Sequence, residues 1–347
     1  MIARLLPNRV RRTYLGGGRI DGFTGGSQPV ATVADAMNCV PPMPRPEDWL
    51  ASTTTAFNGT VEIEGEGLGR IEDGRLVRDV VGDLPFLVKL LDSDERLVIQ
   101  AHPTVPCAKR LFGSPVGKTE CWYFLPGTAP DACVYLGFKP GVTRTVWERA
   151  VLEFSHKERI GHKEEFENYS LLSFLHCIPV APGAFVFVDG GVPHAIGGGC
   201  FMVELQEPSD LMVVAERMTP SGRRIADAKM HGGIGWEKMF DVYEYDTLEY
   251  DDVCQRYVRH CSQMAIDTID ATDKCVLQIC GPELTDKFSM WRIEGQGRLD
   301  LPSPACVIVT DGAGAVNGLS VKKGDRLLVV GERILETDGN AALVICA

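Results

Sequence analysis

The sequence contains no apolar run long enough to cross a membrane as a helix. Such a helix needs about 20 consecutive apolar residues, and no stretch of the 347 residues approaches that length. Residues 1–12 also lack the apolar segment of a secretory signal. These two absences argue against membrane-spanning and secreted proteins, and they predict a cytoplasmic location.

The sequence also lacks the paired cysteines of a zinc finger or a redox motif. Its twelve cysteines are scattered from Cys39 to Cys346, and none forms a C-x-x-C pair. Four of them lie in apolar runs, where cysteine behaves as a small core residue: Cys177, Cys200, Cys306 and Cys346. In a reducing cytoplasm we therefore expect buried free thiols rather than disulfides.

Positive charge is in deficit, with 35 Lys and Arg residues against 47 Asp and Glu residues and a net charge of −12. Nucleic acids and anionic membranes bind to basic surfaces, so we expect neither as a partner. An anionic metabolite can still bind where cations gather locally. The apolar fraction of 45% and the charged fraction of 24% are those of a folded globular protein. Nothing in the composition specifies an oligomeric state.

The first 250 residues read mostly as short strands separated by glycine-rich turns. Aliphatic and aromatic segments bounded by Gly, Pro or Asp predict strands at 84–91, 96–101, 120–125 and 184–188. Two stretches have helical periodicity instead, one starting near Thr143 and one over about 164–175. We therefore predict a β-domain over 1–250 with a helical insertion at about 143–176.

A second, smaller β-domain is predicted over 251–347. Its expected strands lie at 288–294, 306–310, 325–330 and 341–346. Glycine adopts positive φ without steric cost, so the turns at Asp311-Gly312 and Lys323-Gly324 are interpreted as hairpin turns.

Polar residues at strand spacing form a candidate metal site. Side chains two residues apart on a strand project to the same face, so Gln100 and His102 share a face, as do Lys118 and Glu120. His194 follows a strand and a glycine-rich turn. Inward positions on neighbouring antiparallel strands converge, and we expect one divalent ion bound by Gln100, His102, Glu120 and His194. Two imidazoles with oxygen ligands favour zinc, although other divalent metals also accept such ligands.

These residues lie in motifs that resemble the type I mannose-6-phosphate isomerase family, in its short bacterial form. The resemblance runs through nearly the whole chain in the family's order. The matching stretches are 47–52, 99–103, 117–123, 182–187, 192–197, 204–210 and 310–325. The most specific of them is Gly-Lys-Thr-Glu-Cys-Trp, which begins at Gly117 and follows a Gln-x-His-Pro segment.

The resemblance implies a mainly β fold, a cupin (jelly-roll) barrel with a helical insertion and a second β-domain. It implies one Zn²⁺ on the four ligands and interconversion of mannose 6-phosphate and fructose 6-phosphate. In that reaction a proton moves between C1 and C2 through an enediol. Glu204 matches the family's acid/base carboxylate, and Lys118 matches its active-site lysine. The expected partner is therefore a small sugar phosphate.

The chain departs from the family pattern at two positions. The family carries an active-site arginine where this sequence has Val214, and the nearest arginine is Arg217. On a regular strand Arg217 faces away from the side of Val214, so Arg217 is a catalytic candidate only if a bulge turns it inward. Asp189 stands where the family commonly has proline. Two alternatives therefore stay open: a cupin enzyme for a different small sugar, or a catalytically weakened sugar-phosphate-binding protein.

Overall fold

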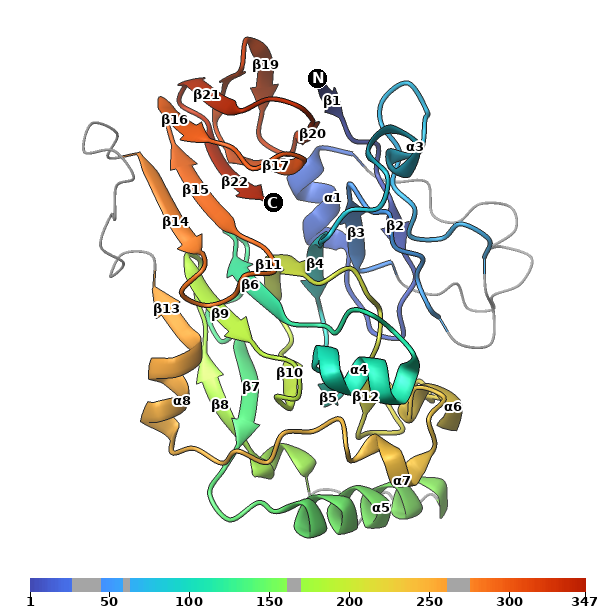
Figure 1. Ribbon diagram of the computed structural model, residues 1–347. Helices are drawn as coiled ribbons and strands as arrows, with labels where there is room; N and C mark the ends of the chain where they lie inside the picture. The colour runs from blue at the N-terminus through green and yellow to red at the C-terminus, as the bar shows by residue number, and fades with distance from the viewer. Residues whose placement is uncertain (27–44, 59–62, 161–169, 261–274) are drawn as a thin grey trace.

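The computed structural model of the protein describes residues 1–26, 45–58, 63–160, 170–260 and 275–347. Within these ranges the strands form four antiparallel sheets (Figure 1). The prediction of a mainly β fold is therefore confirmed. None of the described helices is both long enough and apolar enough to span a bilayer.

Two sheets make up the larger β-block, and both contain strands that carry candidate ligands. The first has the order β13 (Val258–His260), β9 (Ala184–Val188), β6 (Glu120–Phe124), β11 (Cys200–Gln206), β4 (Leu87–Ser93), β3 (Glu47–Leu50) and β2 (Arg9–Val10). The second has the order β12 (Val213–Val214), β5 (Gln100–Ala101), β10 (His194–Ile196), β7 (Cys133–Phe138) and β8 (Leu175–Pro179).

The other two sheets form the block at the top of Figure 1. One has the order β1 (Ile2–Arg4), β20 (Arg326–Val329), β17 (Ala305–Asp311), β22 (Ala342–Cys346), β15 (Met290–Glu294) and β14 (Val276–Cys280). The other has the order β16 (Gly297–Asp300), β21 (Ile334–Gly339), β18 (Ala313–Val316) and β19 (Leu319–Lys322).

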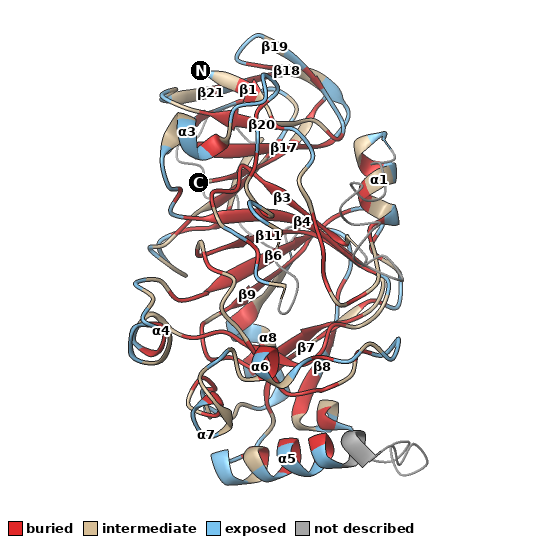
Figure 2. Cartoon of the chain, turned by 90° about the vertical axis from the view of Figure 1, so that its right-hand side faces the viewer, coloured by how far each residue is buried: buried red, intermediate tan, exposed pale blue. Residues whose placement is uncertain are grey.

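Helices lie at the ends and edges of the sheets, with their outer faces exposed (Figure 2). They are α1 (Gly18–Thr24), α3 (Val77–Val81), α4 (Val105–Phe112), α5 (Arg144–Ile160), α6 (Asp227–Met230), α7 (Trp236–Met239) and α8 (Tyr250–Tyr257). Helix α5 is inserted between the paired strands β7 and β8. The second predicted helix falls partly on residues 161–169, outside the described ranges, and its end is the 3-10 helix η2 (Leu171–Phe174).

The two β-blocks share one hydrophobic core. Cys121 on β6 lies in the same buried cluster as Cys280, Cys306 and Cys346 of the C-terminal block. Two strand pairs also join residues on opposite sides of the predicted boundary at residue 250: β1 pairs with β20, and β13 pairs with β9. The division into 1–250 and 251–347 stays a prediction, but the first residues of the chain contribute to the C-terminal sheet.

Three sequence expectations differ from the structure in detail. The strand expected over 96–101 is limited to β5 in the structure, and the Ile99 N–H donates to the Glu216 carboxylate at 2.7 Å instead of to a neighbouring strand. The predicted domain over 251–347 includes helix α8 and strand β13, which pack against the larger β-block and not against the C-terminal sheets. Cys177 is exposed because its side chain projects to the opposite face of β8 from those of the buried His176 and Ile178. Cys200 and the two C-terminal cysteines of the apolar runs are buried.

The two turns interpreted as hairpins connect different sheets. Asp311-Gly312 joins β17 of one sheet to β18 of the other, and Lys323-Gly324 leads back from β19 to β20. The hairpin lies between them at Asn317-Gly318, where both residues have positive φ and Val316 pairs with Leu319. This is the two-residue turn whose twist suits adjacent antiparallel strands.

Candidate metal site and pocket

The candidate ligands come from two sheets and converge between them. Glu120 lies on β6 of one sheet, whereas Gln100 and His194 lie on β5 and β10 of the other. Gln100 and His194 are direct partners across the strand pair, so their side chains project to the same side. One ligand atom each from His102, Glu120 and His194 lies within 4.8 Å of the others.

Backbone hydrogen bonds fix both imidazoles in the orientation that a metal ligand needs. His102 Nδ1 lies 2.9 Å from the Leu211 carbonyl oxygen, and His194 Nδ1 lies 2.9 Å from the Val192 carbonyl oxygen. A carbonyl only accepts, so each Nδ1 carries the proton and each Nε2 presents a lone pair. His194 Nε2 is buried and makes no hydrogen bond within the described residues. An orphaned lone pair beside a carboxylate fits a divalent ion.

Burial and charge give the three groups the protonation states of metal ligands. Burial lowers the pKa of His194 to about 3. Burial, followed by the nearby Lys118 cation, also lowers the pKa of His102. For Glu120, burial alone raises the pKa, but the adjacent Lys118 cation is the largest opposing influence and the pKa lies well below its usual value. Both histidines are therefore neutral and the carboxylate is ionised at neutral pH.

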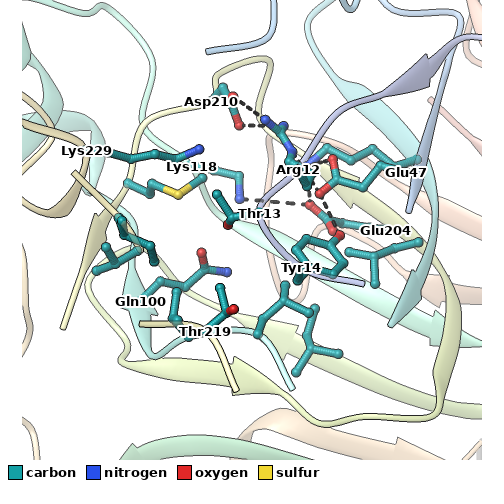
Figure 3. Close-up of a pocket in the computed structure, with 18 residues that line it drawn as sticks. Arg12, Thr13, Tyr14, Glu47, Gln100, Lys118, Glu204, Asp210, Thr219 and Lys229 are labelled. Atoms are coloured by element: carbon teal, nitrogen blue, oxygen red, sulfur yellow. Dashed lines mark hydrogen bonds and ion pairs between the residues drawn. The ribbon is translucent and has the colours of Figure 1, made fainter. Parts of the chain in front are cut away.

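Lys118 contacts the candidate ligands directly. Its Nζ lies 2.7 Å from His102 Nε2 and donates to Glu120 Oε2 at 2.7 Å. The same Nζ lies 3.9 Å from Glu204 Oε1. Lys118 therefore lies between His102 and Glu120 on one side and Glu204 on the other. Figure 3 shows it in the pocket with Gln100 and Glu204.

The segment that carries Lys118 is held by residues of the polar run that begins at Glu204. Glu207 accepts the N–H groups of Gly117 at 3.2 Å and Thr119 at 2.8 Å, and Ser209 Oγ donates to the Gly117 carbonyl at 2.6 Å. A Cβ on Gly117 would lie 2.6 Å from the Pro103 carbonyl oxygen, so only glycine fits there. Lys287 of the C-terminal block donates to Thr119 Oγ1 at 2.6 Å and to Glu207 at 2.8 Å, which ties that block to the site.

A chain of alternating charges extends along the pocket from Glu204 to Asp210. Lys89 Nζ donates to Glu204 Oε1 at 2.7 Å and lies 3.9 Å from Glu47 Oε2. Arg12 then bridges Glu47 at 3.0 Å and Asp210 at 3.1 Å. Burial raises the pKa of Glu204 against the lowering effect of Lys89. For Glu47, burial acts upward, but Arg12 and Lys89 outweigh it and lower the pKa to about 2.

Several of these pocket residues were not identified from the sequence: Arg12, Tyr14, Lys89, Asp210 and Lys229. One signal was available for Lys89, the single charged residue within the apolar stretch Leu87-Val-Lys-Leu-Leu. Cross-strand register places it beside Trp49 on one side and Glu204 on the other. The remaining residues come from loops and a short helix, where sequence periodicity does not predict which side chains point into the pocket.

The structure does not bring Arg217 into the pocket. Its guanidinium is buried, donates to Ser155 Oγ at 2.9 Å, forms an ion pair with Asp227 and lies over the Trp236 ring. Val214, by contrast, lines the pocket with Gln100, Lys118 and Glu204. Asp189 lies outside that pocket, half-buried in a second cavity that Arg256 and Lys287 also line. Arg217 lies beyond the end of β12, and its contacts are with groups outside the pocket, so the inward orientation that a catalytic role requires is not observed.

Comparison with known proteins agrees with this geometry. No protein-family model matches the chain. The chain is 28% identical to mannose-6-phosphate isomerase ManA of Bacillus subtilis over 250 residues, which make up 71% of this chain and 69% of that protein. The resemblance inferred from the sequence motifs is confirmed.

Solved structures of low sequence identity share the fold. A crystal structure of mannose 6-phosphate isomerase from Bacillus subtilis superimposes with a TM-score of 0.68 at 19% identity, over 100% of this chain and 99% of that chain. A mannose 6-phosphate isomerase bound with zinc and yttrium gives a TM-score of 0.63 at 13% identity, over 99% of this chain and 98% of that chain. These matches support the fold of the whole chain.

Proposed function

We propose that this chain, which resembles the mannose-6-phosphate isomerases in sequence and in fold, is a metal-dependent isomerase that interconverts mannose 6-phosphate and fructose 6-phosphate. One observation carries the proposal. The Nε2 atoms of two neutral histidines and the carboxylate of Glu120 converge. Lys118 contacts His102 and Glu120 and lines a pocket together with Gln100 and Glu204. The ligand set Gln100, His102, Glu120 and His194 suits Zn²⁺.

The proposed chemistry assigns a separate task to each part of the site. A divalent ion on these ligands would supply a Lewis acid for the sugar oxygens. Glu204 would take the proton from one carbon and return it to the next, as a positioned carboxylate does in general acid–base catalysis. Its burial, which raises its pKa, favours a carboxylate that exchanges a proton readily. Lys118 would stabilise negative charge on the substrate oxygen.

An assay of the purified chain, coupled to consumption of fructose 6-phosphate, tests the proposal. We expect turnover of mannose 6-phosphate, about one equivalent of zinc per chain by elemental analysis, loss of activity after chelation and recovery on adding Zn²⁺. Glu204→Gln, which keeps the shape and removes the base, should lower kcat by about 10²–10⁴-fold and retain the metal. A chelated protein with undiminished turnover would exclude the metal-dependent route.

Val214 favours a second candidate, an isomerase for an unphosphorylated aldose. The apolar side chain lines the pocket at the position where the family pattern has arginine, so one anion-binding group of that pattern is missing. Comparing kcat/KM for mannose and mannose 6-phosphate separates the two candidates. The sugar phosphate should be preferred by at least tenfold if the first proposal holds.

A further inference from the structure

One cation in the pocket differs from the others because it has no anionic partner. Four cationic side chains line the pocket, among them Lys229, together with three carboxylates. Arg12, Lys89 and Lys118 each lie within 3.1 Å of a carboxylate oxygen. Within the part of the chain that the structure describes, the Lys229 ammonium has neither a hydrogen bond nor an ion pair.

Lys229 is nevertheless buried, with 9% of its surface exposed. A buried ammonium without a hydrogen-bond or ion-pair partner loses hydration that the more distant carboxylates Asp210, Glu47 and Glu66 only partly replace. Burial, followed by repulsion from Arg12, accordingly lowers the pKa of Lys229 to about 8. The side chain still carries most of its charge at neutral pH, and an anion that enters the pocket would relieve the cost.

Lys229 lies on a helix that packs against Val214, the residue that departs from the family pattern. Lys229 lies on the short helix α6, which packs against β12. Val214 of β12 forms a small apolar cluster with Met230 of α6 and with Ile225. Val214 is also the cross-strand partner of Gln100. The helix that carries Lys229 therefore rests on the valine, and both residues line the pocket of Lys118 and Glu204 (Figure 3).

Arg217 does not line the pocket, but it bonds to helix α6 and to the segment just before it. Its guanidinium pairs with Asp227, the first residue of α6, and its carbonyl accepts the Ile225 N–H at 2.7 Å. The nearest arginine in sequence to Val214 thus serves the helix that presents Lys229 rather than the pocket itself.

We propose that Lys229 binds the phosphate group of the substrate and replaces the cation that is absent at Val214. The inference rests on the proposed function for the identity of the substrate, but the anion site can be tested without turnover. The ligand class is a dianionic phosphate monoester, for which an ammonium group without a carboxylate partner is a suitable binder. The apolar contact between β12 and α6 explains why valine is compatible with this arrangement.

The test replaces Lys229 with methionine, which has a side chain of similar length but no charge. We expect KM for mannose 6-phosphate to rise about 10- to 100-fold, the range for loss of a charged hydrogen bond. The inhibition constant of inorganic phosphate should rise by a similar factor, while kcat changes by less than about threefold. Lys229→Arg should retain most of the affinity. The control is Lys238→Met, an exposed lysine on the neighbouring helix α7.

A second substitution tests whether the two positions form one subsite. Adding Val214→Arg to Lys229→Met should recover at least part of the lost phosphate affinity. If the methionine variant does not fold, Lys229→Gln gives the same comparison with a polar, uncharged end. A folded Lys229 variant without charge whose KM and phosphate inhibition both stay within threefold of the parent overturns the assignment.

The outcome also separates this inference from the proposed isomerase activity. If the parent binds inorganic phosphate by calorimetry and Lys229→Met does not, the anion site stands even when mannose 6-phosphate is not turned over. If turnover is fast and the Lys229 variants bind phosphate as the parent does, the isomerase stands and the Lys229 assignment fails.

Discussion

Lys118 Nζ lies 2.7 Å from His102 Nε2 and so occupies the lone pair that a metal ion on His102 would require. The imidazole has a single lone pair at Nε2 because its Nδ1 proton is donated to the Leu211 carbonyl. Lys118 and a divalent ion therefore compete for one atom. Their like charges would also oppose simultaneous binding at this atom.

This competition predicts opposite effects of Lys118→Met on metal binding and on turnover. The apparent affinity for Zn²⁺ should rise by about tenfold, since a charged hydrogen bond to the ligand is removed. Activity should fall by about 10²–10³-fold because the oxyanion loses its cation. Competition with a chromogenic chelator measures the first effect, with the exposed Lys323→Met as control. Weaker metal binding in Lys118→Met would contradict the competition.

The buried histidines predict that the chelated protein loses stability in mild acid. The unfolded chain protonates its histidines near pH 6.5, whereas folded His194 stays neutral down to about pH 3. The unfolded state then binds more protons, so the free energy of unfolding falls as pH falls, by about 1.4 kcal/mol per pH unit for one such group. His102, whose pKa is also lowered, adds to this loss.

Urea denaturation of the chelated protein at pH 7, 6 and 5 measures this dependence. These pH values lie above those at which Glu47, whose pKa is lowered to about 2, would change the free energy of unfolding. His194→Asn keeps a polar group without the titration and should reduce the slope between pH 6 and 5. Equal slopes for the two proteins would mean that His194 is protonated in the fold.

Lys229 predicts a loss of substrate affinity in alkaline solution. The groups that act electrostatically on its ammonium are Arg12, Asp210, Glu47 and Glu66. Its pKa of about 8 means that the charge disappears as pH rises through 8, so kcat/KM for mannose 6-phosphate should fall above that pH. The guanidinium of Lys229→Arg stays charged, and this variant should remove the decline. A profile that is the same in both proteins would assign the titration to another group.

The buried position of Arg217 predicts a structural effect of Arg217→Ala. The guanidinium is 1% exposed and pairs with Asp227, whose side chain is 44% exposed. Breaking a partly buried pair of this kind should lower the free energy of unfolding by about 1–3 kcal/mol. KM should rise because α6 is loosened, while metal content stays unchanged. The exposed pair of Arg144 with Asp241 is the control, and Arg144→Ala should cost less than about 1 kcal/mol.

Two features of the site followed from the sequence because they depend on local periodicity. The two-residue spacing of Gln100 and His102, and of Lys118 and Glu120, predicts that each pair projects to one side of an extended segment. In the structure Gln100 and Glu120 lie on β5 and β6, and His102 and Lys118 lie just beyond the ends of these strands. His194 was identified from the strand and glycine-rich turn around it. The structure brings His102, Glu120 and His194 together. Short-range geometry and a recognisable motif order were sufficient for this part.

The tertiary structure alone decided which cations surround the pocket and which turns are hairpins. Lys89 meets Glu204 only because β4 pairs with β11 across 115 residues of sequence, and Lys229 reaches the pocket only because α6 packs against Val214. The turns at Gly312 and Gly324 have the composition of hairpins, yet their flanking strands find partners in different sheets. Strand pairing and helix docking minimise the exposed apolar surface of the whole chain, so no local pattern specifies them.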